Sequence, residues 1–180
     1  MLRFLKKKFV FRKNNKVDIL LLDANYSNLN LKDKIKFVLN LNEINIYYIL
    51  KALIIYLSYK DLRRNYWKLF YEDLDPKVAI GHDINFKIFD YKDLFPHKMT
   101  ICYQLGHYWD IHIERSQERF LGKKCDFFLA FTDWEIKNIF NKINTKFLIT
   151  GSIKNNNYSK KSNSKIYDIM VISEFRFLNP

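Results

Sequence analysis

The chain has 180 residues, of which 48% are apolar, 17% aromatic and 28% charged. This size suits one α/β domain, and so apolar a composition excludes a chain that is disordered throughout, as well as collagen-like and coiled-coil proteins. Its four glycines and three prolines are too scattered for a G-x-G-x-x-G or P-loop fingerprint, and neither motif occurs in the sequence.

The net charge of +12 is concentrated in two segments. Residues 1–16 carry seven basic and no acidic side chains, and residues 154–165 carry four lysines and no acid, which leaves 17–153 at +2. Because the body is nearly neutral, we do not favour nucleic acid as a partner. A basic module that stacks bases on Tyr108 and Trp109 is the alternative function, and it predicts binding that weakens steeply with salt.

Cysteine usage and hydropathy predict a cytoplasmic protein. Cys102 and Cys125 are too few and too far apart for a disulfide framework or a zinc site. Lys6, Lys7 and Lys8 interrupt the apolar residues at the N-terminus, so they form no signal-peptide core. The most apolar segment, 44–59, is shorter than the about 20 residues that span a bilayer, and we interpret it as a buried helix.

The first half of the chain predicts two strands followed by two helices. The apolar run from Lys16 to Asp23 is typical of a strand buried on both faces, and the alternation over 35–41 indicates a second strand. Segment 44–57 is apolar almost all round. Segment 62–74 has an apolar stripe at helical spacing, and Asp75-Pro76 ends it.

Strands and helices then alternate regularly. Apolar runs predict strands over 77–81, 99–104, 125–131 and 146–150. Between the last two, Thr132-Asp-Trp-Glu135 matches a capping box that opens a helix. Strand–helix–strand order favours parallel pairing, so the predicted fold class is α/β, with an open, mainly parallel Rossmann-like sheet flanked by helices.

Four segments describe the expected domain organisation. A basic tail over 1–16 precedes a Rossmann-like domain over 17–151, and an Asn/Ser/Lys-rich linker follows over 152–165. Residues 166–180 contain another buried-strand pattern. Because one strand cannot form a core by itself, we expect it to open a second domain that is missing here.

Ligands of open parallel sheets bind at the carboxyl ends of the strands, and this rule selects the candidate site residues. The loops there predict substrate-binding roles for Asp23, Asn25, Tyr26, His82, Asn85, Gln104, Gly106, Thr132, Asp133, Gly151 and Ser152. Turn and cap roles are the structural alternative for each of them, above all for Thr132.

His107 and Asp83 are the candidate catalytic residues. Imidazole titrates near neutral pH, and a carboxylate can orient it or act as a base itself. The alternative is that His82 and His107 are ordinary loop residues. His107, His112 and Glu114 have poor spacing for a metal, so no metal site is predicted.

Five segments taken in order carry a family resemblance. They are Leu22-Asp23, Pro76-Lys-Val-Ala-Ile80 followed by Asp83, Ile101-Cys-Tyr-Gln104-x-Gly106, Cys125-Asp126, and Gly151-Ser-Ile-Lys-Asn-Asn156. The chain over about residues 17–178 resembles the amino-terminal domain of surface carbohydrate (capsule or lipopolysaccharide) biosynthesis proteins of the GT-B type. Tyr167 to Arg176 looks like the first strand of that family's second domain.

The resemblance implies the acceptor-side part of a glycosyltransferase-like protein. Its partner would be a sugar or a lipid-linked sugar acceptor. The nucleotide-sugar donor would bind mainly to the missing second domain, so no cofactor is expected here and the 180 residues alone should transfer no sugar. A degenerate or truncated relic that folds poorly is a further alternative.

A solvated terminus is the favoured interpretation of residues 1–16. The alternative is peripheral contact with the inner face of an anionic membrane, because Phe4, Phe9 and Phe11 lie between the basic residues.

Overall fold

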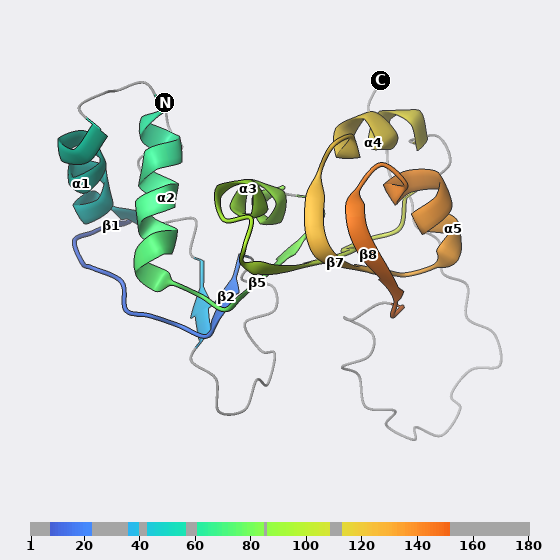
Figure 1. Ribbon diagram of the computed structural model, residues 1–180, viewed down its shortest axis with the longest axis horizontal. Coiled ribbons are helices and arrows are strands. Elements are labelled where there is room, and N and C mark those ends of the chain that lie inside the picture. The colour runs from blue at the N-terminus through green and yellow to red at the C-terminus, as the bar shows by residue number, and fades with distance from the viewer. Residues whose placement is uncertain are drawn as a thin grey trace, which may run out of the picture.

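The computed structural model describes residues 8–22, 36–39, 43–56, 61–84, 86–108 and 113–151. Its centre is a six-stranded sheet in the order β3-β2-β5-β6-β7-β8, and every neighbouring pair is parallel (Figure 1). The strands are β2 (Ile19–Leu21), β3 (Lys36–Val38), β5 (Val78–His82), β6 (Met99–Tyr103), β7 (Lys124–Ala130) and β8 (Asn144–Ile149). The predicted open, parallel α/β fold is confirmed.

Helices connect these strands. They are α2 (Leu62–Leu74), α3 (Lys87–Leu94), α4 (Ile113–Phe120) and the short α5 (Asp133–Glu135), which continues as a π-helical turn, η3 (Ile136–Phe140). In Figure 1, α3, α4 and α5 lie on the same side of the sheet. The end of α2 is as predicted: the Asp75 backbone N–H donates to the Tyr71 carbonyl, and Pro76 cannot continue the helix.

The N-terminal segment differs from the tail predicted for residues 1–16. Strand β1 (Lys8–Val10) pairs in parallel with β4 (Glu43–Asn45), and α1 (Ile46–Tyr56) follows β4 directly. The Asn14 backbone N–H donates to the buried Tyr48 hydroxyl at 2.8 Å. Residues 8–16 therefore belong to the folded part of the chain, while 1–7 lie outside the described residues.

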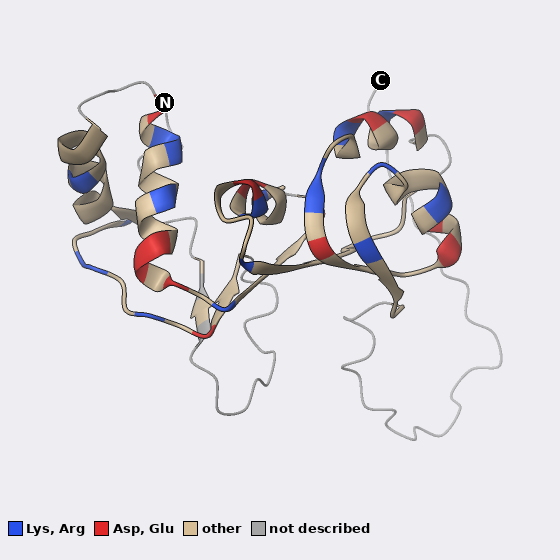
Figure 2. Cartoon of the chain, in the orientation of Figure 1, with Lys and Arg blue, Asp and Glu red and all other residues tan. Residues whose placement is uncertain are grey.

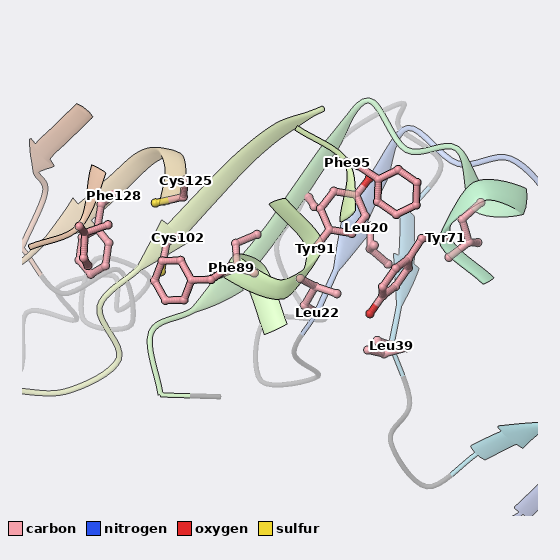
Figure 3. Packing of buried hydrophobic residues seen from close by; sticks show 14 of the residues in the cluster. Leu20, Leu22, Leu39, Tyr71, Phe89, Tyr91, Phe95, Cys102, Cys125 and Phe128 are labelled. Atoms are coloured by element: carbon pink, nitrogen blue, oxygen red, sulfur yellow. The ribbon is translucent and has the colours of Figure 1, made fainter. Parts of the chain in front are cut away.

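One apolar core runs along the helix-covered face of the sheet. Leu20, Leu22, Phe89, Cys102 and Phe128 are all essentially inaccessible to solvent and lie along this face (Figure 3). Packing of this kind fixes the strand ends, and with them the loops that carry the candidate site residues.

Gly81 permits the close packing of α3 on β5. A Cβ atom at this position would lie 3.1 Å from the Cβ of Ile88 and 3.3 Å from that of Leu22. Any larger residue would push α3 away from the sheet just before the candidate site begins.

The linker expected over 152–165 and the strand expected over 166–180 lie outside the described residues. Within the described part of the chain, no helix combines the length and apolarity that crossing a membrane requires.

Candidate acid–base site

The loops that follow β5 to β8 start at one edge of the sheet. Backbone hydrogen bonds continue to the ends of the strands, from Asp83 N to the Tyr103 carbonyl at 3.2 Å and from Gln104 N to the Leu129 carbonyl at 2.9 Å. A third joins Thr150 N to the Ala130 carbonyl at 3.0 Å. The polar residues at these ends are therefore neighbours in space, as the parallel topology predicts.

Gln104 links three parts of this edge. Its side-chain oxygen accepts from Phe131 N at 2.9 Å, in the loop after β7. Its Nε2 donates to the Gly106 carbonyl at 2.8 Å and to Glu135 Oε1 at 2.5 Å. The side chain is buried, and both its oxygen and its nitrogen are hydrogen-bonded. Gln104 therefore holds Gly106, Phe131 and Glu135 in fixed relative positions.

Glu135 is a buried carboxylate, with 2% of the residue exposed. Besides the bond from Gln104, it accepts from the Thr132 hydroxyl at 3.1 Å and contacts His107 Nδ1 at 3.0 Å. A carboxylate taken out of water requires such partners. The predicted N-cap role of Thr132 is confirmed, since its hydroxyl accepts from Glu135 N at 3.4 Å.

His107 is held on one side and open on the other. Its side chain is 71% exposed although Nδ1 faces the buried Glu135, and its ring rests edge-on against Phe131 at 5.0 Å. Because a carboxylate only accepts hydrogen bonds, Nδ1 of a neutral imidazole must carry the proton. Nε2 is then the free basic nitrogen, as a general base requires.

Asp83 has a different environment from Glu135. The residue is fully buried, its Oδ1 accepts from Leu105 N at 3.1 Å, and its Oδ2 accepts from the Tyr108 hydroxyl at 2.7 Å. Burial raises the pKa of Asp83 to about 6. These two hydrogen bonds hold the loop at residues on either side of His107, so Asp83 positions that loop. The carboxylate in contact with the imidazole is that of Glu135.

The other predicted residues divide into three groups. Gln104, Gly106 and Thr132 join His107 around Glu135. His82 is buried and accepts from Ile84 N through Nδ1, the exposed Asp133 pairs with Lys137, and Gly151 has a left-handed φ of 66°. The remaining predictions concern residues outside the described ranges, namely Asp23, Asn25, Tyr26, Asn85 and Ser152.

Sequence reasoning missed two central residues, Glu135 and Tyr108. The capping-box pattern already explains Glu135, and no local pattern in the sequence points to His107 as its partner. Tyr108 was considered only as an exposed stacking ring. It in fact packs against Phe120 and Phe140 and donates to Asp83.

An open hollow of about 420 Å³ lies at the opposite, amino-terminal edge of the sheet, near Met99 and Lys146. Two of its lysines are already engaged: Lys92 pairs with Asp126 at 2.7 Å and Lys98 with Asp75 at 2.6 Å. This hollow lies away from the His107 cluster. Across the described ranges, no group of three or more His, Cys, Asp or Glu residues is arranged to hold a metal, and Glu114 lies on helix α4.

Comparisons of the chain with protein-family models, with curated proteins and with solved structures found no match.

Proposed function

We propose that this chain is the acceptor-side domain of a glycosyltransferase-like protein of surface carbohydrate biosynthesis, with His107 as the general base. One observation carries the proposal. An exposed imidazole is held by the buried Glu135 at the carboxyl edge of an open parallel sheet. Ligands of such sheets bind at this edge.

The chemistry needs a hydroxyl group beside His107. A sugar hydroxyl that donates to Nε2 gives up its proton there as its oxygen bonds to the anomeric carbon of the donor sugar, while the bond from that carbon to the leaving diphosphate breaks. The imidazolium so formed is stabilised by Glu135, 3.0 Å from Nδ1. The nucleotide-sugar would bind mainly to a second Rossmann-like domain.

The acceptor we propose is a sugar or a lipid-linked sugar at the inner, cytoplasmic face of a membrane. The surface around His107 is consistent with a sugar, since an aromatic ring, Phe131, lies beside the imidazole. The nucleic-acid alternative is less favoured, because Tyr108 is used in packing and several lysines, including Lys16, Lys77 and Lys92, are paired with carboxylates.

Sugar binding by the full chain tests the proposal. The chain would be titrated with methyl glycosides of glucose, galactose, mannose and N-acetylglucosamine while the amide signals of Gly106 and Phe131 are followed by NMR. We expect at least one glycoside to shift these signals, and His107→Ala to weaken its binding about tenfold, a loss typical of a hydrogen bond to a good acceptor.

His97→Ala is the matched control, because His97 is also exposed but lines the hollow at the opposite edge. It should leave glycoside binding unchanged. The proposal is wrong if none of the four glycosides shifts Gly106 or Phe131, or if His107→Ala binds them as tightly as the natural chain.

A further inference from the structure

Helix α1 buries one side and exposes an apolar opposite side. Its sequence, Ile46 to Tyr56, contains one lysine and no acidic residue. Tyr48 and Ala52 are buried, whereas Leu50 is 47% and Ile54 73% exposed. Tyr47, Leu50 and Ile54 follow one another at i, i+3 and i+7, so they form one stripe along the helix. A helix of this composition ordinarily has all its sides covered.

Strand β1 extends this stripe. Phe9, in β1, is 58% exposed, and Phe11, one residue beyond the strand, is 68% exposed. The ring of Phe11 meets that of Tyr47 edge-on at 5.8 Å. We call Phe9, Phe11, Tyr47, Leu50 and Ile54 together the α1 face.

The charges beside the α1 face are positive. Lys8 and Lys13, on either side of Phe9 and Phe11, are exposed, and residues 8–17 contain no acidic residue. Two nearby carboxylates are already paired: Glu43 with Arg12 at 3.2 Å, and Asp73 with Tyr48 and Lys51. In Figure 2 the ribbon of α1 is tan apart from one blue segment, with further blue along the chain that leads from β1.

We propose that the α1 face docks on an anionic lipid bilayer. Apolar tips flanked by lysines are the features of an interfacial helix, whose apolar side enters the acyl boundary while its basic neighbours meet the phosphate headgroups. Helix α1 lies at the opposite end of the long axis from α5 (Figure 1). Docking there leaves the His107 edge free, and the inference stands independently of the proposed chemistry.

Co-sedimentation of the full chain with vesicles tests this inference. We expect binding to vesicles of phosphatidylglycerol and phosphatidylcholine, and at least tenfold weaker binding to phosphatidylcholine alone. The double variant Leu50→Gln/Ile54→Asn should bind the anionic vesicles at least tenfold more weakly, and Lys8→Gln/Lys13→Gln should reduce the dependence of binding on anionic lipid. Both pairs of side chains are exposed, and circular dichroism would check the fold of each variant.

Leu121→Gln is the control, since Leu121 is 67% exposed but lies after α4; it should bind as the natural chain does. The inference is overturned if the chain does not bind anionic vesicles, or if Leu50→Gln/Ile54→Asn leaves binding unchanged. It is also overturned if sedimentation velocity finds a dimer that this double variant dissociates, because the face would then belong to a second copy.

Discussion

Two buried carboxylates, Asp83 and Glu135, divide the work at the candidate site. Glu135 contacts the imidazole of His107 and orients it, whereas Asp83 holds the loop that carries the imidazole through Leu105 N and the Tyr108 hydroxyl. The two roles differ because the partners differ: Glu135 contacts a titratable imidazole, whereas Asp83 accepts hydrogen bonds from a backbone N–H and a hydroxyl. A general base needs both a charge that stabilises its protonated form and a fixed position.

Asp83→Asn should remove a pH dependence of stability. The pKa of Asp83 is about 6 in the folded chain and 3.8 in the reference state, so its contribution to stability is fully present below pH 3.8 and is lost as the pH rises through 6. This loss amounts to about 3 kcal/mol. Urea unfolding of both proteins should therefore show that, from pH 4 to pH 7, the free energy of unfolding of Asp83→Asn rises relative to that of the natural chain. A difference that stays constant across this range would contradict the assignment.

Part of the site could be predicted from the sequence. The position of residues at strand ends was enough to select His107, Gln104, Gly106 and Thr132, because parallel strands end at one edge. Which carboxylate meets His107 could not be predicted, because Glu135 reaches it across 28 positions of sequence through the direction of a short helix. That direction depends on tertiary packing and leaves no local pattern.

At the scale of elements, close contact between α3 and β5 fixes where the site begins. Gly81→Ala would place a methyl group 3.1 Å from the Cβ of Ile88. We expect the free energy of unfolding to fall by about 1–3 kcal/mol as α3 is displaced. Urea denaturation measures this, with Gly106→Ala as the control because no atom lies within 4 Å of a Cβ built there. Equal effects of the two substitutions would refute this role for Gly81.

Apolar periodicity in the sequence predicts some helices and strands of the fold but not others. The range of α2 and the strands β5 to β8 were predicted within two residues, because long apolar patterns mark them. Helices α3 and α4 were not, since each has only eight residues and a largely polar surface. The three-residue strands β1 and β4 are too short to show alternation, so the sequence of residues 8–16 predicts a tail and not a strand.

At the scale of the whole molecule, one core joins the N-terminal helices to the sheet. Tyr71 of α2 packs against Tyr91 and Phe95. Phe70 of the same helix packs against Phe37 of β3. The buried Tyr48 ties α1 to the chain on both sides, since its hydroxyl accepts from Asn14 N and donates to Asp73. The α1 face is therefore presented by a part of the molecule that is fixed to the sheet.

Tyr48→Phe should destabilise the whole molecule. Removing the hydroxyl leaves a buried N–H and a carboxylate short of a partner, which costs about 1–3 kcal/mol. Thermal unfolding followed through Trp67 and through Trp134 should shift to lower temperature by the same amount. Tyr47→Phe is the control, because the Tyr47 hydroxyl makes no hydrogen bond within the described ranges. A shift seen by Trp67 alone would show that the N-terminal helices unfold separately.

The nitrogen NMR spectrum of the His107 ring tests the central claim most directly. For the neutral ring of the natural chain, we predict a proton on Nδ1 and none on Nε2, because Glu135 accepts from Nδ1. In Glu135→Ala the proton should move to Nε2. A natural chain whose neutral ring already carries its proton on Nε2 would contradict the account, because Glu135 would then not orient His107 as a base.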